Sequence, residues 1–353
     1  MSVAMATHKE HIPSLDGLRA VSILLVFVSH CKLEKLVPGG LGVTLFFFLS
    51  GFLITTLLRQ EFENRGRISL RNFYLRRIFR IWPPFYLVLL ASTALTLLGV
   101  LSGHVSWAGL ASQLLHFANY NLIWLHNDIP VGTGVYWSLA IEEHFYLLFP
   151  MLYILLCSRG VSVRRQATIL AAICGAILVW RCLLVFGMHV PNPRTYYASD
   201  TRFDNILYGC LLAIAANPVM DRPLISDVWM KYLFLPAGFA LLLATLLFRN
   251  EAFRETLRYT LQGIAMSPIL IAAIRFPEWA LFRWLNYRWI SFLGVVSYSL
   301  YLVHQTVIIA VQERLLLHPV FQGLIAFLAA IAITIALHFA VERPFAKLRK
   351  RFR

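Results

Sequence analysis

Residues 41–58 read LGVTLFFFLSGFLITTLL and carry no charged side chain. A helix of about 20 mostly apolar residues crosses the hydrocarbon core of a bilayer, so this stretch predicts a membrane span. Similar runs recur along the 353-residue chain, and the predicted spans are 15–34, 41–58, 81–101, 136–156, 167–187, 203–217, 232–248, 257–274, 289–312 and 320–341. We therefore predict an all-α fold, a polytopic transmembrane helix bundle of about 10 spans.

The composition supports a multi-pass membrane protein, which we expect in the plasma (bacterial inner) membrane. Hydrophobic residues make up 59% of the chain and charged residues 14%, whereas a soluble domain has about 25% charged residues. With ten spans, 22 of the 32 Lys and Arg residues lie on one side and 8 on the other. The positive-inside rule then predicts that both termini are cytoplasmic. We divide the chain into a transmembrane domain, 1–346, and a basic cytoplasmic tail, 347–353.

The basic charge and the cysteines exclude other classes of protein. The net charge of +15 comes from basic loops that we expect to lie against anionic lipid, so we predict no nucleic-acid partner. The five cysteines contain no C-x-x-C pair, and we expect neither a disulfide framework nor a metal site. Residues 107–125 are apolar but interrupted by polar side chains, which favours an outer interfacial or re-entrant helix over an eleventh span.

The first span contains ionisable groups. Residues 11–30 read HIPSLDGLRAVSILLVFVSH and include Asp16, Arg19 and His30. Arg19 and His30 are eleven residues apart, which places them within about 20° of one helix face and roughly 16 Å apart along its axis. They therefore lie on one interior stripe and cannot touch. Such groups indicate a functional site, although a snorkelling Arg and an interfacial His are the structural alternative.

The fourth span contains two adjacent acids. Residues 135–150 read VYWSLAIEEHFYLLFP, with Trp137 at the outer end. Glu142 and Tyr146 share a helix face, whereas Glu143 points about 100° away. We predict that Glu142 faces the interior with a partner. Glu143 is expected near the headgroups or bound to a cation of an outer loop.

Charged residues also stand at the ends of two other spans. Asp200, Arg202 and Asp204 alternate in sign within YYASDTRFDNILYG, which suits a self-neutralising cluster at the outer mouth. Structural and functional roles are equally supported there. Glu342 follows the last span within the sequence ERPF, where a helix-end salt bridge is the simple structural interpretation.

Two segments could receive a cytoplasmic ligand. Ser50 and Gly51 interrupt a Phe-rich helix, which permits either close helix packing or the passage of a thin substrate arm. Arg76, Arg77 and Arg80 end the first inner loop. Arginine forks suit phosphate geometry, so this loop either binds an anion or simply carries positive-inside charge.

The ninth span carries a histidine among tyrosines. Residues 297–305 read SYSLYLVHQ, with Tyr298, Tyr301 and His304 loosely on one side. A histidine satisfied by interior hydrogen bonds and a working histidine are equally compatible with this position.

Taken together, these segments resemble the acyltransferase-3 family of integral membrane acyl-CoA-dependent O-acyltransferases. The resemblance covers Ile12 to Phe345, and the segments occur in the family's order: LDGLRAVSILLVFVSH, FFFLSGFLIT, the Arg-x-x-Arg of Arg77 and Arg80, WSLAIEEHFYLLFP, DTRFDNILYG, SYSLYLVHQ and ERPF. His144 departs from the family, which more often has Gln there. The extracellular hydrolase-like C-terminal domain of some members is not in this sequence, so we expect a second transfer step to need another protein.

The resemblance implies a transferase for acyl groups other than aminoacyl groups. An acyl group, most often acetyl, would pass from cytosolic acyl-CoA to a hydroxyl of a cell-surface or exported glycan or lipid. Arg77 and Arg80, with Arg76 beside them, would hold the CoA phosphates. The pantetheine arm would pass Ser50 and Gly51.

A hydroxyl needs a base to become a good nucleophile, and histidine is the best-matched side chain. We predict that His30 is this base, that Glu142 or Asp16 orients a cation or the acceptor, and that Arg19 supports the arm or the oxyanion. Direct attack and a transient acyl group on His30 both remain open. Residues expected to support the substrate or the site are Trp137, Tyr146, Asp200, Arg202, Asp204, Tyr301, His304 and Glu342.

Two other function classes use the same features. A transporter of a small solute or lipid-linked sugar also needs interior ionisable groups. The transporter hypothesis predicts inverted repeats, however, and the two halves of the sequence show no clear self-similarity. A sensor or scaffold is the third class. The acceptor is not specified by the sequence: candidates are cell-surface polysaccharide, lipopolysaccharide, lipid-linked or exported oligosaccharide, and a macrolide-type metabolite.

Overall fold

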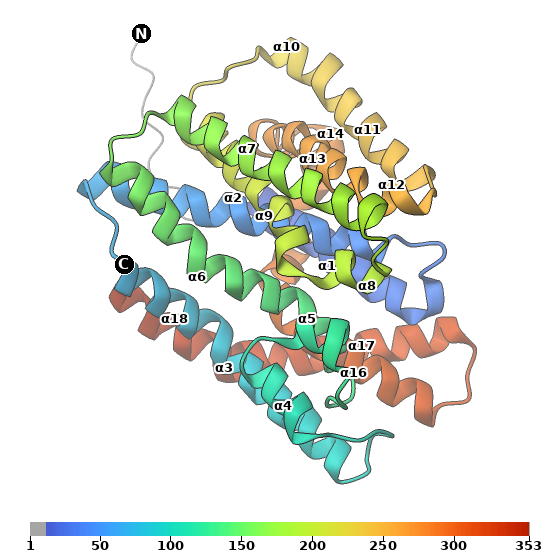
Figure 1. Cartoon of the computed structure of the whole chain (residues 1–353). Helices are drawn as coiled ribbons and strands as arrows, with labels where there is room; N and C mark the ends of the chain where they lie inside the picture. Colours follow the sequence, from blue (N-terminus) through green and yellow to red (C-terminus); the bar gives the residue numbers. More distant parts are fainter. Residues whose placement is uncertain (1–11, 353) are drawn as a thin grey trace.

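The computed structural model describes residues 12–352, which form helices joined by short turns with no β-strand among them. Figure 1 shows the helices gathered side by side into one bundle. The α-helices are α1 (Pro13–Val28), α2 (Gly39–Arg65), α3 (Leu70–Leu97), α4 (Trp107–Leu114), α5 (Ala118–Tyr120), α6 (Trp137–Ser158), α7 (Val163–Cys182), α8 (Asn192–Tyr197), α9 (Ser199–Ala215), α10 (Asp227–Trp229), α11 (Leu235–Leu247), α12 (Glu251–Glu255), α13 (Leu257–Arg275), α14 (Ala280–Arg283), α15 (Arg288–Val295), α16 (Ser297–Arg314), α17 (Pro319–Leu337) and α18 (Arg343–Arg349).

The prediction of a polytopic helical bundle is confirmed. Within residues 12–352, eight helical stretches are long and apolar enough to cross a membrane, and the bent pair α15–α16 makes a ninth span if it crosses as one unit. The predicted span 203–217 falls in α9, which has 17 residues. Its length of about 26 Å is slightly short of the hydrocarbon core. This helix packs against α2, α7 and α13, so it lies inside the bundle.

Residues 107–125 form no eleventh span. They fold into α4, α5 and one turn of π-helix, Asn121–Leu125, each too short to cross a bilayer. His116 lies between α4 and α5 with a left-handed backbone (φ 57°). Its ring stacks on Phe85 of α3 at 4.6 Å between centroids. The segment therefore reaches into the bundle, as a re-entrant segment does.

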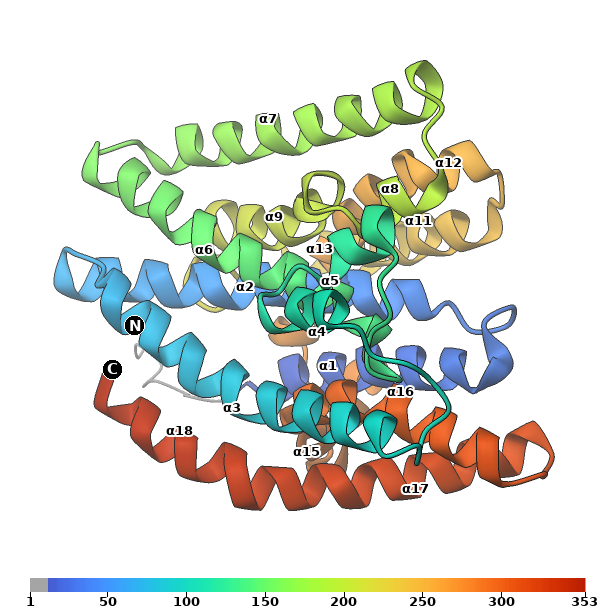
Figure 2. The same cartoon turned by 60° about the horizontal axis from the view of Figure 1, so that its bottom comes forward.

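The two ends of the bundle differ in charge. Figure 2 shows the α2–α3 turn, the α6–α7 turn and α18 at one end, and the α16–α17 turn at the other. We call the first the basic end, because these three elements carry Arg67, Arg159, Arg343, Lys347 and Arg349. The positive-inside rule assigns the basic end to the cytoplasm, and this orientation stays a prediction.

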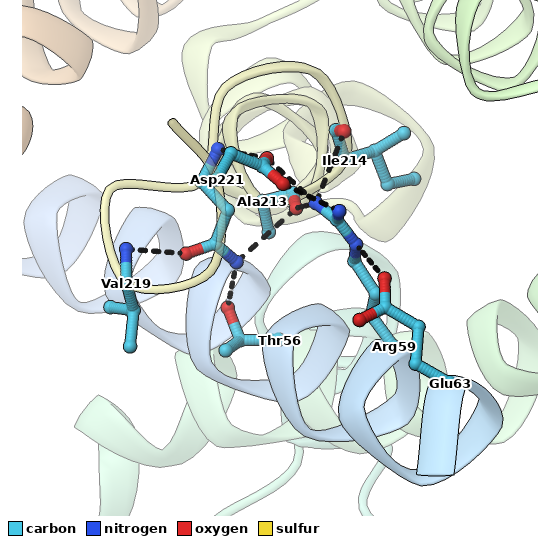
Figure 3. Close-up of polar contacts among 8 residues, drawn as sticks. Thr56, Arg59, Glu63, Ala213, Ile214, Val219 and Asp221 are labelled. Atoms are coloured by element: carbon cyan, nitrogen blue, oxygen red, sulfur yellow. Dashed lines mark hydrogen bonds and ion pairs between the residues drawn. The ribbon is translucent and has the colours of Figure 1, made fainter. Parts of the chain in front are cut away.

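An ion pair at the basic end ties α2 to the turn after α9 (Figure 3). Arg59 donates to both carboxylate oxygens of Asp221, at 2.8 and 2.6 Å, and to the Ala213 carbonyl oxygen at 3.1 Å. Glu63 accepts from the same guanidinium at 2.8 Å. Although burial disfavours the Asp221 carboxylate, its hydrogen bonds with Arg59 lower its pKa below the usual value. The loop that follows α9 is thereby fixed against α2.

Helix α2 crosses α9 at very short range because both helices have a glycine at the contact. A Cβ atom on Gly51 would lie 1.9 Å from the Ile206 carbonyl oxygen, and one on Gly209 would lie 2.0 Å from the Phe48 carbonyl oxygen. Backbone atoms cannot move aside as a flexible side chain can. Gly51 is therefore a packing residue, which is the alternative that small residues in membrane helices favour.

Gly51→Ala is expected to destabilise the fold by about 1–3 kcal/mol, because overpacking forces α2 and α9 apart. Thermal unfolding of the detergent-solubilised protein measures the change. Gly175→Ala in α7 is the matched control, since a Cβ there meets nothing within 4 Å, and it should leave the midpoint unchanged or slightly higher. An equal response of the two variants would contradict the packing role.

Candidate active site

Two adjoining cavities open inside the bundle near its basic end. The inner cavity has a volume of about 80 Å³ and is lined by α1, α2, α3, α6 and α16. The second, which we call the arginine cavity, has a volume of about 360 Å³ and is lined mainly by α1, α3 and the C-terminal helices. Both cavities share the lining residues Arg19, Leu53, Arg80 and Tyr298. The two cavities are therefore neighbours with these four residues at their boundary, and we call the pair of cavities the passage.

The bend between α15 and α16 makes room for this passage. The two helices meet at 72° around Val296. Helix α15 lies close against α1, because a Cβ atom on Gly294 would be 1.8 Å from the Asp16 carbonyl oxygen. Residues on either side of the bend line the cavities: Val295 lines the arginine cavity, Ser297 the inner cavity and Tyr298 both.

A chain of hydrogen bonds crosses the inner cavity from α2 to α6. The Tyr146 hydroxyl donates to Glu142 Oε2 at 2.7 Å, and the Ser50 hydroxyl contacts the Tyr146 oxygen. Because the single Tyr146 proton goes to Glu142, Ser50 donates to Tyr146. The Arg77 guanidinium lies 5.5 Å from the centroid of the Tyr146 ring. The prediction that Glu142 and Tyr146 share an inward face with a partner is confirmed.

Glu143 also lines the inner cavity, so its predicted place near the headgroups is wrong. Its Oε1 is buried and accepts no hydrogen bond within the described part of the chain. The cavity covers a wider arc of α6 than one helix stripe, which explains why both acids face it. A buried carboxylate oxygen without a donor is costly and is available to a ligand.

Arg19 and Asp16 lie at the junction of the two cavities. Arg19 lines both, and Asp16 lines the arginine cavity with a carboxylate oxygen 4.0 Å from the Arg19 guanidinium. Arg19 therefore points toward the cavities inside the bundle. Arg80 lines both cavities with it, so two guanidinium groups flank the passage.

His30 and His304 form a hydrogen-bonded pair, with 3.1 Å between His30 Nδ1 and His304 Nε2. His304 Nδ1 lies 2.6 Å from the Tyr301 carbonyl oxygen. A carbonyl oxygen only accepts, so His304 Nδ1 carries the proton, and in the neutral ring Nε2 accepts from His30 Nδ1. We assign the tautomers from these partners. The lone pair of His30 is then on Nε2, where a base needs it.

Tyr301 connects the histidine pair to the inner cavity. Its hydroxyl donates to the Val135 carbonyl oxygen at 2.9 Å and contacts Ser138 Oγ at 2.7 Å, and both Tyr301 and Ser138 line the inner cavity. Its backbone carbonyl accepts from His304. The sequence suggested a shared side for Tyr301 and His304, and the structure joins them directly.

Of three further predicted site residues, Arg76 and Gly51 lie outside the two cavities, whereas Glu342 lines one of them. Arg76 is bound by Glu61 at 2.7 Å and by the Phe352 carbonyl oxygen at 2.8 Å. Gly51 packs on α9. Glu342 lines the arginine cavity, where Ser299 donates to one of its oxygens and His338 contacts the other, both at 2.6 Å.

The prediction of a self-neutralising cluster in α9 is wrong, because each charge finds a partner on another element. Asp200 pairs with Arg194 at 2.5 Å, and Asp204 pairs with Arg181 at 2.7 Å. Arg202 is two positions from each acid, and residues two apart in a helix point to nearly opposite sides, so alternating signs do not bring these charges together. Arg202 is 1% exposed.

Arg202 is held by aromatic rings. Its guanidinium carbon lies 4.1 Å from the Tyr259 ring centroid, 5.3 Å from that of Tyr196 and 5.6 Å from that of Trp137. It also donates to the Asn205 amide oxygen at 2.9 Å. Trp137 therefore serves as part of this cage, which holds α6, α8 and α9 together through cation–π contacts.

Some lining residues were missed by the sequence interpretation. Ser138 precedes Glu142 by one helical turn, so the stripe that selected Glu142 and Tyr146 would have found it. Tyr298 was placed on one side with Tyr301 and His304, but no sequence pattern marked the bend that precedes it. Arg343 and Arg349 line the arginine cavity, but the sequence interpretation gave Arg343 no role in the site and placed Arg349 in the basic tail, 347–353.

The fold and this site define a class: a multi-pass membrane protein whose ionisable groups line connected cavities inside the bundle. The family model described as "Acyltransferase domain" matches residues 12–342. The chain therefore belongs to the acyltransferase 3 family. The resemblance drawn from the motifs is confirmed.

The curated relatives are named as O-acetyltransferases. The chain is 29% identical over 360 residues to the "Putative peptidoglycan O-acetyltransferase YrhL" of Bacillus subtilis (strain 168), with 96% of this chain and 55% of that protein covered. It is 28% identical over 319 residues to "O-acetyltransferase OatA" of Staphylococcus aureus (strain NCTC 8325 / PS 47), with 86% and 51% covered. The chain spans about half the length of these relatives. No solved structure matches it.

Proposed function

We propose that this protein is a membrane O-acetyltransferase that moves an acetyl group from acetyl-CoA, bound at the basic end, to a hydroxyl of a cell-surface or exported glycan or lipid. One observation carries the proposal. A passage lined by Arg19 and Arg80 leads through the inner cavity to Tyr301, whose carbonyl accepts from the His30–His304 pair. A donor that enters from the basic end can thus approach the histidine pair from inside the bundle.

His30 acts as the general base in the proposed reaction. The acceptor oxygen attacks the thioester carbonyl carbon as His30 Nε2 removes the hydroxyl proton. The carbon–sulfur bond then breaks, and the CoA sulfur takes the proton from His30 as the new ester forms. His304 accepts from His30 Nδ1–H and so stabilises the charged ring that forms in between. His304 is a positioning residue.

Arg19 belongs to the donor side of this proposal. It stands roughly 16 Å from His30 along one helix, too far to bind an oxyanion that forms beside His30. Glu142 and Asp16 likewise lie along the passage, where Tyr146 and Arg19 are next to them. These residues guide the pantetheine arm.

The small inner cavity supports acetyl as the transferred group. Its volume of about 80 Å³ corresponds to a few water molecules, which suits a two-carbon acetyl group better than a long acyl chain. For the acceptor, we propose a cell-wall type glycan as the first candidate, because the relative that covers 96% of this chain carries peptidoglycan in its name. A transporter without acyl chemistry is the alternative, and membership of an acyltransferase family speaks against it.

Membranes that contain the wild-type protein, incubated with acetyl-labelled CoA, are expected to transfer label to a glycan or lipid fraction. Arg80→Ala should lower this transfer about tenfold or more, because Arg80 flanks the passage. Arg164→Ala, an exposed arginine of the basic end, is the control and should match wild type. If wild type neither binds CoA nor labels any acceptor, the donor assignment fails and the transporter becomes the better hypothesis.

A further inference from the structure

The C-terminal segment Arg343–Phe352 forms one wall of the arginine cavity, through Arg343, Ala346 and Arg349. We infer that this wall binds the phosphorylated adenosine end of the donor, the 3′-phosphate and diphosphate of CoA. The inference rests on the proposed function and adds to it the part of the donor that α18 recognises.

The C-terminal segment is held in place by contacts with α3. The Phe79 ring stacks with Phe352 at 5.6 Å and an interplanar angle of 9°, and with Phe345 at 6.1 Å and 27°. Arg76 donates to the Phe352 carbonyl oxygen at 2.8 Å and pairs with Glu61. The segment is therefore a built part of the cavity and not a loose tail.

The charges around the arginine cavity favour an anion. Four arginines line it, namely Arg19, Arg80, Arg343 and Arg349, against the two carboxylates of Asp16 and Glu342. Both Glu342 oxygens are already engaged, one by Ser299 and the other by His338. The excess of guanidinium groups in a partly enclosed space suits phosphate oxygens, which the planar arginine fork binds in pairs.

The position of the cavity matches the shape of acyl-CoA. The phosphates of CoA and its thioester are at opposite ends of the molecule, joined by the pantetheine arm. The arginine cavity is the larger of the two and adjoins the narrow inner cavity at Arg19 and Arg80. A CoA molecule whose phosphates bind in the arginine cavity would thus extend its pantetheine arm toward the inner cavity and the histidine pair.

This assignment changes the predicted phosphate site. The family resemblance implied that Arg77 and Arg80, with Arg76 beside them, hold the phosphates. In the structure Arg76 ties Phe352 to Glu61, and Arg77 lines the inner cavity beside Tyr146. Arg80 alone of the three lines the arginine cavity, and the remaining phosphate contacts come from the other end of the chain.

Binding of CoA and of pantetheine to the purified full chain, in a detergent without anionic lipid, tests the inference. Wild type should bind CoA more tightly than pantetheine, which lacks all the phosphates. Arg343→Gln and Arg349→Gln are each expected to weaken CoA binding about tenfold and to leave pantetheine binding unchanged. Lys347→Gln is the control: it removes a neighbouring charge of α18 that does not line the cavity. Arg349→Lys, which keeps the charge without the fork, should fall between.

Two outcomes overturn the inference. One is equal loss of CoA and pantetheine binding in the glutamine variants, which would mean general damage. The other is unchanged CoA binding together with lost binding of phosphatidylglycerol vesicles, which would assign the arginines to a lipid headgroup phosphate. The transfer assay is a separate readout. Normal phosphate-dependent CoA binding without any acetyl transfer would refute the proposed function and leave this site standing.

Discussion

His30→Ala is expected to lower acetyl transfer about 10³-fold while CoA binding stays within about twofold of wild type. The reason is the geometry of the pair: His304 Nε2 accepts from His30 Nδ1 at 3.1 Å, which leaves His30 Nε2 to take the hydroxyl proton. General base catalysis contributes about 10²–10⁴-fold. CoA binding should survive, because His30 lines neither cavity. Labelled transfer and CoA binding are measured on the same membranes.

Variants at His304 separate a positioning role from a structural one. His304→Ala removes the acceptor for His30 Nδ1–H, and a loss smaller than that of His30→Ala is expected. His304→Gln should keep more activity than His304→Ala, because its side-chain oxygen can accept the same hydrogen bond. If His30→Ala keeps more than about a tenth of wild-type transfer, His30 is not the general base. Glu143, which has a buried oxygen without a hydrogen-bond donor among the described residues, is then the next candidate.

The parts of the site that follow one helix were predictable from the sequence. Glu142 and Tyr146 are one turn apart, and the helical repeat alone places them on one face. The depth of Arg19 below His30 follows from the rise per residue. The same rule would have added Ser138. In each case the information lies within a few turns of one helix.

The parts that join distant segments were not predictable. His30 meets His304 across 274 positions of the chain, and the partners of Asp200 and Asp204 stand on other elements. Such pairs depend on how helices pack, which no local pattern specifies. Glu143 was misplaced for the same reason: a cavity bounded by five helices is wider than the stripe of one. The count of spans differed at α9, since a 17-residue buried helix looks the same as a short span in the sequence.

Arg181→Ala is expected to destabilise the protein by about 3–5 kcal/mol, the largest stability effect we predict. Arg181 and Asp204 are both 0% exposed, and their charged groups lie 2.7 Å apart. Arg181 also donates to the Thr201 carbonyl oxygen at 2.7 Å and to the Thr260 hydroxyl at 2.8 Å. Removing Arg181 leaves the Asp204 carboxylate buried without its counter-charge, and α7, α9 and α13 lose their common contact.

Arg194→Ala is the matched control, because it breaks a pair whose acid, Asp200, is 42% exposed. Solvent screening limits the cost there to about 1 kcal/mol or less. The double variant Arg181→Met with Asp204→Leu removes both buried charges and should be clearly more stable than Arg181→Ala, since an apolar pair of similar size costs little in a buried site. Thermal unfolding in detergent measures all three. A double variant no more stable than Arg181→Ala would show that the hydrogen bonds to Thr201 and Thr260, and not the buried charge, hold these helices together.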